Sequence, residues 1–234
     1  MTTPEGDWQV ACGQERFEEC QKDEKFAYIV ALGRAVNSLN FVYSAMLCAG
    51  TGDSPDARRA RLNSYLFASA ILYEGLKLVR AMNQTFKQDE VFQEGLHNIL
   101  RDEVAQTIEQ AHLNPARNRA VFHFLPEFFA EMIASASCEE CLFVSAHGKR
   151  RRDLYYPFAD VITAGILVGF SSDTEEFSVI LGKAMSDTTD LMIRFIDGAE
   201  LLIAYHINRW GFEAKEISPP DPPSPASPEN QSLG

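Results

Sequence analysis

Hydrophobic residues recur every three or four positions through most of the chain, which is the spacing of helices that bury one face. The pattern predicts a helix over residues 23–48 and a second over 55–87, separated by the helix-breaking run Gly50-Thr-Gly-Asp-Ser-Pro55. Two long helices joined by a short loop pack antiparallel, so they begin a bundle. The first helix is expected to bury Phe26, Ile29, Val30, Gly33, Val36, Asn40, Tyr43 and Leu47.

Further helices are predicted downstream of this pair. Apolar positions over residues 88–111 indicate one broken helix or two short ones, and helices over 127–137 and 157–170 follow the same spacing. Ser172-Asp-Thr-Glu175 is a capping box, which predicts the start of a last long helix that ends at Gly211.

Strand character is predicted in one place. Residues 141–146 and 152–156 are short apolar and aromatic stretches around a turn that begins His147-Gly148-Lys149, a pattern typical of a β-hairpin. A lone hairpin is only marginally stable in water, so we expect it to lie against the helices.

These elements predict an all-α fold, a helical bundle with a small β-hairpin insertion, over residues 23–215. Residues 1–22 are polar and mixed, which predicts an N-terminal arm or a short helix. Residues 216–234 are rich in proline and serine and cannot bury apolar area, so they are predicted to form a disordered tail.

The formal net charge of the 234-residue chain is −12, which repels polyanions at long range. This argues against a protein that coats nucleic acid, although it leaves room for an enzyme with a local basic pocket. RNA binding by such a chain is expected to be weak and sensitive to salt.

The cysteines and the apolar runs predict a reduced, cytoplasmic protein without a membrane span. The five cysteines are odd in number and irregular in spacing, and the first residues are polar and acidic, unlike a secretory signal. The longest apolar run, Val161 to Phe170, is too short to cross a bilayer. Cys138-Glu-Glu-Cys141 has the spacing of half a zinc site, but without a second such pair two ordinary cysteines are the simpler interpretation.

Residues 114–126 contain the clearest candidate chemistry. Asn114 is a good N-cap, Pro115 suits the first helical position, and Pro126 ends or kinks the segment. Between them Arg117, Asn118 and His123 stand among apolar neighbours. A cation, an amide and an imidazole on a helix bounded at both ends indicate a candidate site.

Arg117-Asn118 followed by His123 resembles the R-x4–6-H motif of the HEPN superfamily. The resemblance extends over residues 23–210 and implies an all-α fold and a homodimer. Many members of that superfamily are metal-independent ribonucleases in toxin, phage-defence or RNA-processing systems, and others have no known catalysis. For this chain it implies an RNA substrate, no cofactor and no metal, with an antitoxin or a regulatory protein as a further partner.

The implied mechanism assigns proton transfer to His123, the scissile phosphate to Arg117 and a supporting hydrogen bond to Asn118. The expected product is a 2′,3′-cyclic phosphate. Because Arg117 and His123 are six residues apart, they lie about 120° apart around one α-helix. The resemblance therefore implies a composite site, in which two motif helices meet across a dimer axis.

Several other residues are weaker candidates. Glu74 pairs with Lys77 at i,i+3 as an ordinary solvated ion pair, but a carboxylate on this helix could also orient Arg117. Arg119 shares a helix face with His123. A run of four basic residues consists of Lys149, Arg150, Arg151 and Arg152. It is either a solvated loop or a segment that binds the RNA backbone.

Two other classes of protein remain open. The chain could be a non-catalytic helical interaction or scaffold protein, with Arg117 paired to acidic neighbours and His123 packed in the core. The pairs Glu94…His97 and Glu109…His112 have the E-x-x-H spacing of a di-iron carboxylate bundle, although such a site needs them on two long facing helices together with further carboxylates.

Overall fold

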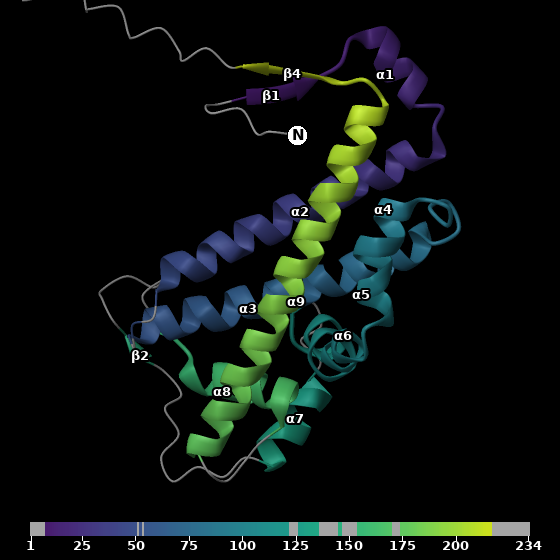
Figure 1. The fold of residues 1–234 in the computed structure, drawn as a ribbon. Coiled ribbons are helices and arrows are strands. Elements are labelled where there is room, and N and C mark those ends of the chain that lie inside the picture. The colour runs from purple at the N-terminus through teal and green to yellow at the C-terminus, as the bar shows by residue number, and fades with distance from the viewer. Residues whose placement is uncertain are drawn as a thin grey trace, which may run out of the picture.

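The structure is a computed structural model of the 234-residue chain. It describes these parts of the chain: residues 8–50, 52, 54–121, 126–135, 145–146, 154–169 and 174–216. Three long helices dominate the fold, with shorter helices and two small strand pairs around them (Figure 1).

The frame of the fold consists of α2 (Glu24–Ala49), α3 (Pro55–Met82) and α9 (Thr174–Arg209). Helices α2 and α3 lie side by side in opposite directions, and α9 packs across both (Figure 1). Asp23 and Ser54 cap the first two, because their side-chain oxygens accept hydrogen bonds from backbone N–H groups of the first turn. Gly50, at φ +64°, ends α2.

The main core lies where these three helices meet. Leu32 and Leu39 of α2, Leu72 of α3 and Phe195 of α9 are at most 1% exposed. Gly75 of α3 allows the closest approach, because a Cβ built there would lie 2.7 Å from Cζ of Phe195. The crossing of α3 and α9 therefore depends on the missing side chain.

The buried stripe of α2 differs from the predicted one. The structure buries Ile29, Leu32, Val36, Leu39 and Val42, whereas Val30 and Leu47 are 58% and 64% exposed. Apolar residues occur on every side of this helix, so periodicity alone could not decide which side faces the core.

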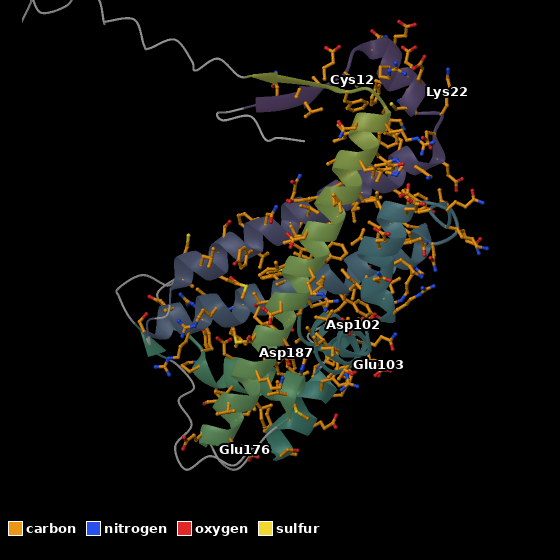
Figure 2. The ribbon with its side chains drawn as sticks, viewed as in Figure 1. Cys12, Lys22, Asp102, Glu103, Glu176 and Asp187 are labelled. Atoms are coloured by element: carbon orange, nitrogen blue, oxygen red, sulfur yellow. The ribbon has the colours of Figure 1, made fainter. Side chains whose placement is uncertain are left out.

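The chain from residue 90 to 121 is helical with one sharp break. The first part contains α4 (Glu90–Phe92), the π-helical turn η1 (Gln93–His97) and α5 (Asn98–Arg101). Asp102 then takes an extended conformation, caps α6 (Glu103–Ile108) and pairs with Arg194 of α9 at 2.6 Å. Figure 2 shows Asp102 at this break, next to α9.

Asn114 does not begin a helix, contrary to the sequence prediction. Its φ and ψ of −63° and −48° are helical, and helix continues from α6 through η2 (Glu109–Leu113) to η3 (Ala116–Val121). Both η elements are π-helical, and they lie on either side of Pro115. A proline inside a helix removes one backbone hydrogen bond and crowds the preceding turn, and the wider π-turns accommodate it.

A second, smaller cluster of buried residues connects the motif segment to the rest of the fold. Tyr65 and Leu66 of α3, Ala116 and Ala120 of η3, and Leu167 of α8 (Pro157–Val168) pack together. Helix α7 (Pro126–Ser135) packs against α8. This packing fixes the described part of the motif helix against α3.

Two antiparallel strand pairs complete the structure. Strands β2 (Ser145–Ala146) and β3 (Leu154–Tyr155) form the predicted hairpin. Strands β1 (Trp8–Ala11) and β4 (Glu213–Glu216) pair with Trp8 opposite Glu216, and α1 (Gln14–Cys20) follows β1. Strand β1 was not predicted, because its partner lies at the far end of the sequence.

The prediction of an all-α bundle with a small β-hairpin is confirmed. The predicted tail after residue 216 lies outside the described residues. Within the described residues, none of the helices has both the length and the apolarity that a membrane span requires.

Candidate functional site

Arg117 projects from η3 toward α3, where a carboxylate holds it. Its Nε donates to Oε1 of Glu74 at 3.0 Å, and Lys77 contacts the other oxygen of Glu74 at 3.0 Å. The side chains of Arg117 and Glu74 are 27% and 44% exposed, so the pair lies at the surface. The carboxylate that the sequence suggested as an orienting partner for Arg117 is therefore in contact with it.

Arg117 also lines a groove of about 310 Å³ between α2 and α3. Its walls are mostly small or apolar, and Arg34 of α2 contributes a second guanidinium. Arg34 has no ion-pair partner among the residues that the structure describes. Two guanidinium groups and one carboxylate line the groove, so it is locally positive in a chain whose net charge is −12.

The pKa of Glu74 reflects these neighbours. Partial burial on its own would raise the pKa, but hydrogen bonds from Lys77 and Arg117 outweigh burial and hold the pKa of Glu74 below its ordinary value. Glu74 is therefore ionised at neutral pH and keeps the Arg117 guanidinium oriented toward the groove.

The other described motif residues point elsewhere. Asn118 is exposed, and its amide donates to the side-chain oxygen of Asn114 one turn earlier. Arg119 lies over the ring of Phe128 on α7, with Cζ 5.0 Å from the ring centroid. The structure thus brings Arg117 and Glu74 together, and it places Arg119 against a different element.

The remaining predicted site residues lie outside the described part of the chain. They are His123, the basic residues Lys149, Arg150, Arg151 and Arg152, and the cysteines Cys138 and Cys141. Their roles stay predictions.

The two E-x-x-H pairs do not converge. Glu109 forms a two-pronged ion pair with Arg80, and Glu94 is exposed. His97 is 8% exposed, and neither of its ring nitrogens has a hydrogen-bond partner among the described residues. Among the described residues no group of three or more His, Cys, Asp or Glu side chains could hold a metal ion.

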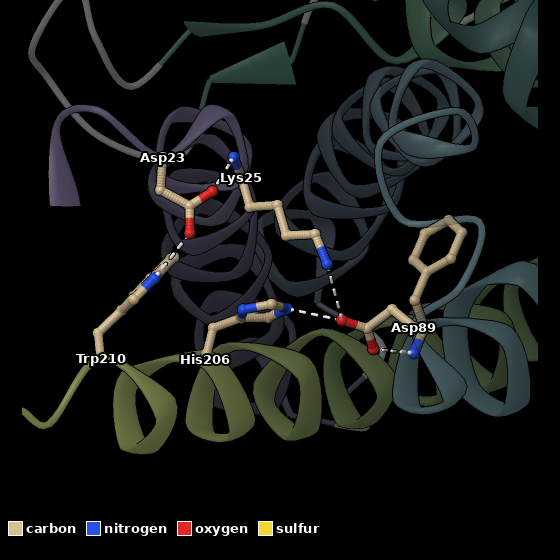
Figure 3. Close-up of polar contacts among 6 residues, drawn as sticks. Asp23, Lys25, Asp89, His206 and Trp210 are labelled. Atoms are coloured by element: carbon tan, nitrogen blue, oxygen red, sulfur yellow. Dashed lines mark hydrogen bonds and ion pairs between the residues drawn. The ribbon is translucent and has the colours of Figure 1, made fainter.

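A second polar cluster, which the sequence did not reveal, lies at the end of the bundle near the strands (Figure 3). His206 of α9 bonds through Nε2 to Oδ2 of Asp89 at 2.9 Å, and Nζ of Lys25 on α2 lies 3.4 Å from the same oxygen. The side chains of His206 and Asp89 are 1% and 2% exposed. Beside them the indole of Trp210 donates to Asp23 at 3.0 Å.

This cluster joins three elements. The other oxygen of Asp89 accepts the backbone N–H of Phe92, so the residue also caps α4. Burial lowers the pKa of His206, and the attraction of Asp89 opposes this only in part. The neutral imidazole therefore donates from Nε2, while its buried Nδ1 has no partner within the described residues. Two ordinary signals could have located the cluster: an Asp placed to cap Glu90-Val91-Phe92, and a histidine at the end of an apolar stripe.

Comparison with known proteins finds no family model, no curated protein and no solved structure that matches this chain. The functional assignment therefore depends on the residues of the chain itself.

Proposed function

We propose that this chain is a metal-independent endoribonuclease of the HEPN type, acting in the cytoplasm. Arg117 binds the scissile phosphate, His123 transfers the protons and Asn118 assists. The observation that carries the proposal is the positive groove between α2 and α3, where Glu74 orients Arg117 and Arg34 lies unpaired among the described residues. An arginine fixed in this way can form two hydrogen bonds to one phosphate group.

The proposed reaction needs neither a metal nor a cofactor. One His123 imidazole takes the proton of the RNA 2′-hydroxyl, and the 2′-oxygen attacks phosphorus. Arg117 stabilises the negative charge that develops on the phosphorane oxygens. The bond from phosphorus to the 5′-oxygen breaks, and a histidinium returns a proton to that oxygen. The products are a 2′,3′-cyclic phosphate and a 5′-hydroxyl.

The proposal includes a homodimer, because the resemblance implies that two motif helices share one cleft. One His123 then acts as the base and its copy acts as the acid. Arg119 and the basic run 149–152 add contacts to the RNA backbone. A protein that covers this cleft, such as an antitoxin, is a further partner in the same proposal.

The test is cleavage of a labelled RNA in the presence of EDTA. Arg117→Ala and His123→Ala are each expected to lower the cleavage rate by about 10²–10⁴-fold, the usual value of an acid–base or charge-stabilising group. Arg59→Ala is the matched control, because Arg59 lies on α3 in an exposed ion pair with Asp56. Cleavage that EDTA abolishes, or that survives His123→Ala, contradicts the proposal.

One observation favours a non-catalytic interaction protein of the same fold as the second candidate. Glu74 already occupies Arg117 within the chain, and a purely structural arginine would show the same contact. In that case the wild type leaves RNA intact, and Arg117→Ala changes only the stability of the fold.

A further inference from the structure

A second hollow of the surface lies between α9 and the segment that α6 and η2 form, and we call it the α6–α9 cleft. Its volume is about 560 Å³, which is within the range of about 300–1,000 Å³ that small-molecule sites occupy. Most of its walls are apolar: Val104, Ile108, Val179, Ile180 and Ala184. Apolar walls with a few polar groups among them are typical of a site for a small organic ligand.

Apolar side chains from both sides of the cleft are exposed. Val104 of α6 is 62% exposed, and Val179 and Ile180 of α9 are 65% and 39% exposed. Because these side chains line one hollow, the hydrocarbon part of a single ligand can cover all of them, and removing that area from water favours binding.

The π-turn η2 brings His112 into line with the apolar wall. In a regular α-helix, side chains four residues apart, as Val104, Ile108 and His112 are, drift around the axis by about 40° at each step. The π-turn begins at Glu109 and holds more residues per turn, so it cancels the second drift. Single π-turns are frequent at functional sites. Burial lowers the pKa of His112, so the imidazole is neutral at neutral pH and adds no charge to the cleft.

The carboxylates of the cleft lie toward one end. Along α9 the lining residues begin at Val179 and end at Asp187. Asp102 pairs with Arg194, which lies beyond Asp187 on α9. Glu103 follows Asp102 in the chain, so it too lies toward the Asp187 end (Figure 2). Glu103 is exposed and has no ion-pair partner among the residues that the structure describes.

Lys183 shows which head group this end of the cleft accepts. Its ammonium lies 2.7 Å from Oδ2 of Asp187, and its side chain is 74% exposed. An exposed ion pair of this kind is weak, so another ammonium group can replace Lys183 at little cost. Two carboxylates and one ammonium line the cleft, which leaves one net negative charge. The groove that holds Arg117 is positive, so the two hollows attract ligands of opposite charge.

We infer that the α6–α9 cleft binds an amphipathic primary amine, whose ammonium group contacts Asp187 and Glu103 and whose hydrocarbon chain extends toward Val179. From Asp187 to Val179 the axis of α9 advances by about 12 Å, which gives room for an extended octyl chain. The carboxylates, and the net charge of −12 on the whole chain, repel an anionic head group. The inference involves neither Arg117 nor His123, so it goes beyond the proposed ribonuclease activity, and either proposal can fail without the other.

The first test compares three probes with the same chain and different head groups: octylammonium, octanol and octanoate. Each is titrated into the full-length protein in a calorimeter, below the concentration at which it forms micelles. Octylammonium is expected to bind at least about tenfold more tightly than octanoate, because a hydrogen bond to a charged group contributes about that factor. Octanol is expected to lie between them. Octylammonium that does not bind, or that binds no more tightly than octanoate, overturns the inference.

The length of the hydrocarbon chain tests the apolar walls. Shortening octylammonium to butylammonium is expected to weaken binding by up to about fourfold for each methylene lost. Equal affinities for the two amines would mean that the hydrocarbon stays in water, and would overturn the apolar half of the inference.

The second test locates the amine with variants of the cleft. Asp187→Asn is expected to weaken the binding of octylammonium about tenfold, and Glu103→Gln to weaken it less. Lys183→Gln is expected to strengthen it about two- to fivefold, because the competing ammonium is gone. Asp197→Asn and Lys87→Gln are the matched controls, since they change the net charge equally at exposed positions outside the cleft. A loss for Asp197→Asn as large as that for Asp187→Asn means that the amine binds the net charge of the chain, and overturns the site.

Discussion

Asp89 and Glu74 are two carboxylates with the same task in different surroundings. Each is shared by two basic groups: Asp89 by His206 and Lys25, and Glu74 by Arg117 and Lys77. The side chain of Asp89 is 2% exposed, whereas that of Glu74 is 44% exposed. The chemistry is similar, and burial is the main difference.

Burial decides what each group can do. In the buried Asp89 cluster, water cannot replace a lost hydrogen-bond partner, whether the carboxylate or one of its basic partners is removed. The Asp89 cluster therefore stabilises the fold. At the surface, water replaces a lost partner at little cost. The Glu74 cluster can therefore exchange partners with a ligand, and a site for an anion is expected there rather than at Asp89.

The largest predicted effect comes from removing the buried carboxylate. Asp89→Ala leaves the Nε2–H of His206, the Lys25 ammonium and the backbone N–H of Phe92 without their acceptor. We expect the free energy of unfolding to fall by about 3–5 kcal/mol. Urea unfolding followed by circular dichroism measures it. A loss no larger than that of Glu74→Ala, within about 1 kcal/mol, would remove the distinction between the two clusters.

The second prediction changes the packing beside the groove and leaves the charges of the groove unchanged. Gly75→Ala places a methyl group 2.7 Å from the Phe195 ring, and such overpacking costs about 1–3 kcal/mol. Gly182→Ala on α9 is the control, because no atom of the described residues lies within 4 Å of a Cβ built at Gly182. It is expected to stabilise the helix by up to about 1 kcal/mol. Equal changes in melting temperature for the two variants would show that α3 and α9 do not approach closely at Gly75.

The third prediction concerns pH. Burial lowers the pKa of His206, His97 and His112, so the unfolded chain binds more protons than the folded one near and below pH 6.5. The stability that these histidines contribute is therefore fully present above pH 6.5 and is lost as the pH falls. Each histidine contributes at most about 1.4 kcal/mol per pH unit. His206→Gln is expected to reduce the slope of unfolding free energy against pH between 7 and 5; an unchanged slope argues against a neutral His206.

The smallest effect on stability, and the most specific effect on binding, is expected at Glu74. Glu74→Gln should change the unfolding free energy by less than about 1 kcal/mol. The substitution removes a negative charge from the groove, so it should tighten the binding of an RNA with 2′-O-methyl groups. Cleavage of ordinary RNA should slow, because Arg117 loses its orientation. Asp56→Asn changes the net charge equally, elsewhere on α3, and should alter neither. Weaker RNA binding by Glu74→Gln would indicate that the RNA does not bind in the groove between α2 and α3.

Local signals predicted much of the fold. The glycines after α2 and α9, Gly50 and Gly211, marked the ends of these helices correctly, because helix termination depends on neighbouring residues. Asn114 and Pro115 carried the signal of a helix start, yet tertiary packing of Ala116 and Ala120 keeps that segment inside a continuous helix. The exposed side of α2 and the pairing of β1 with β4 depend on distant contacts, which local patterns do not contain.

The candidate site was predicted unevenly for the same reason. Glu74 could be proposed as a partner for Arg117, because both are charged and a helical bundle brings distant helices together. Asp89 and His206 are 117 positions apart, and each has an ordinary local role, as a cap and as part of an apolar stripe. Their contact follows only from the packing of α9 against α4, which no spacing in the sequence specifies.

The pairing of β1 with β4 also determines how the molecule responds to pulling. Trp8, the first residue of β1, lies opposite Glu216, the last residue of β4, at the outer end of this strand pair. A force applied to the two ends therefore loads one residue pair at a time, from Trp8–Glu216 inward to Ala11–Glu213. The two strands therefore separate at low force. Only then does the force act on α9 and on the buried His206 near the end of α9.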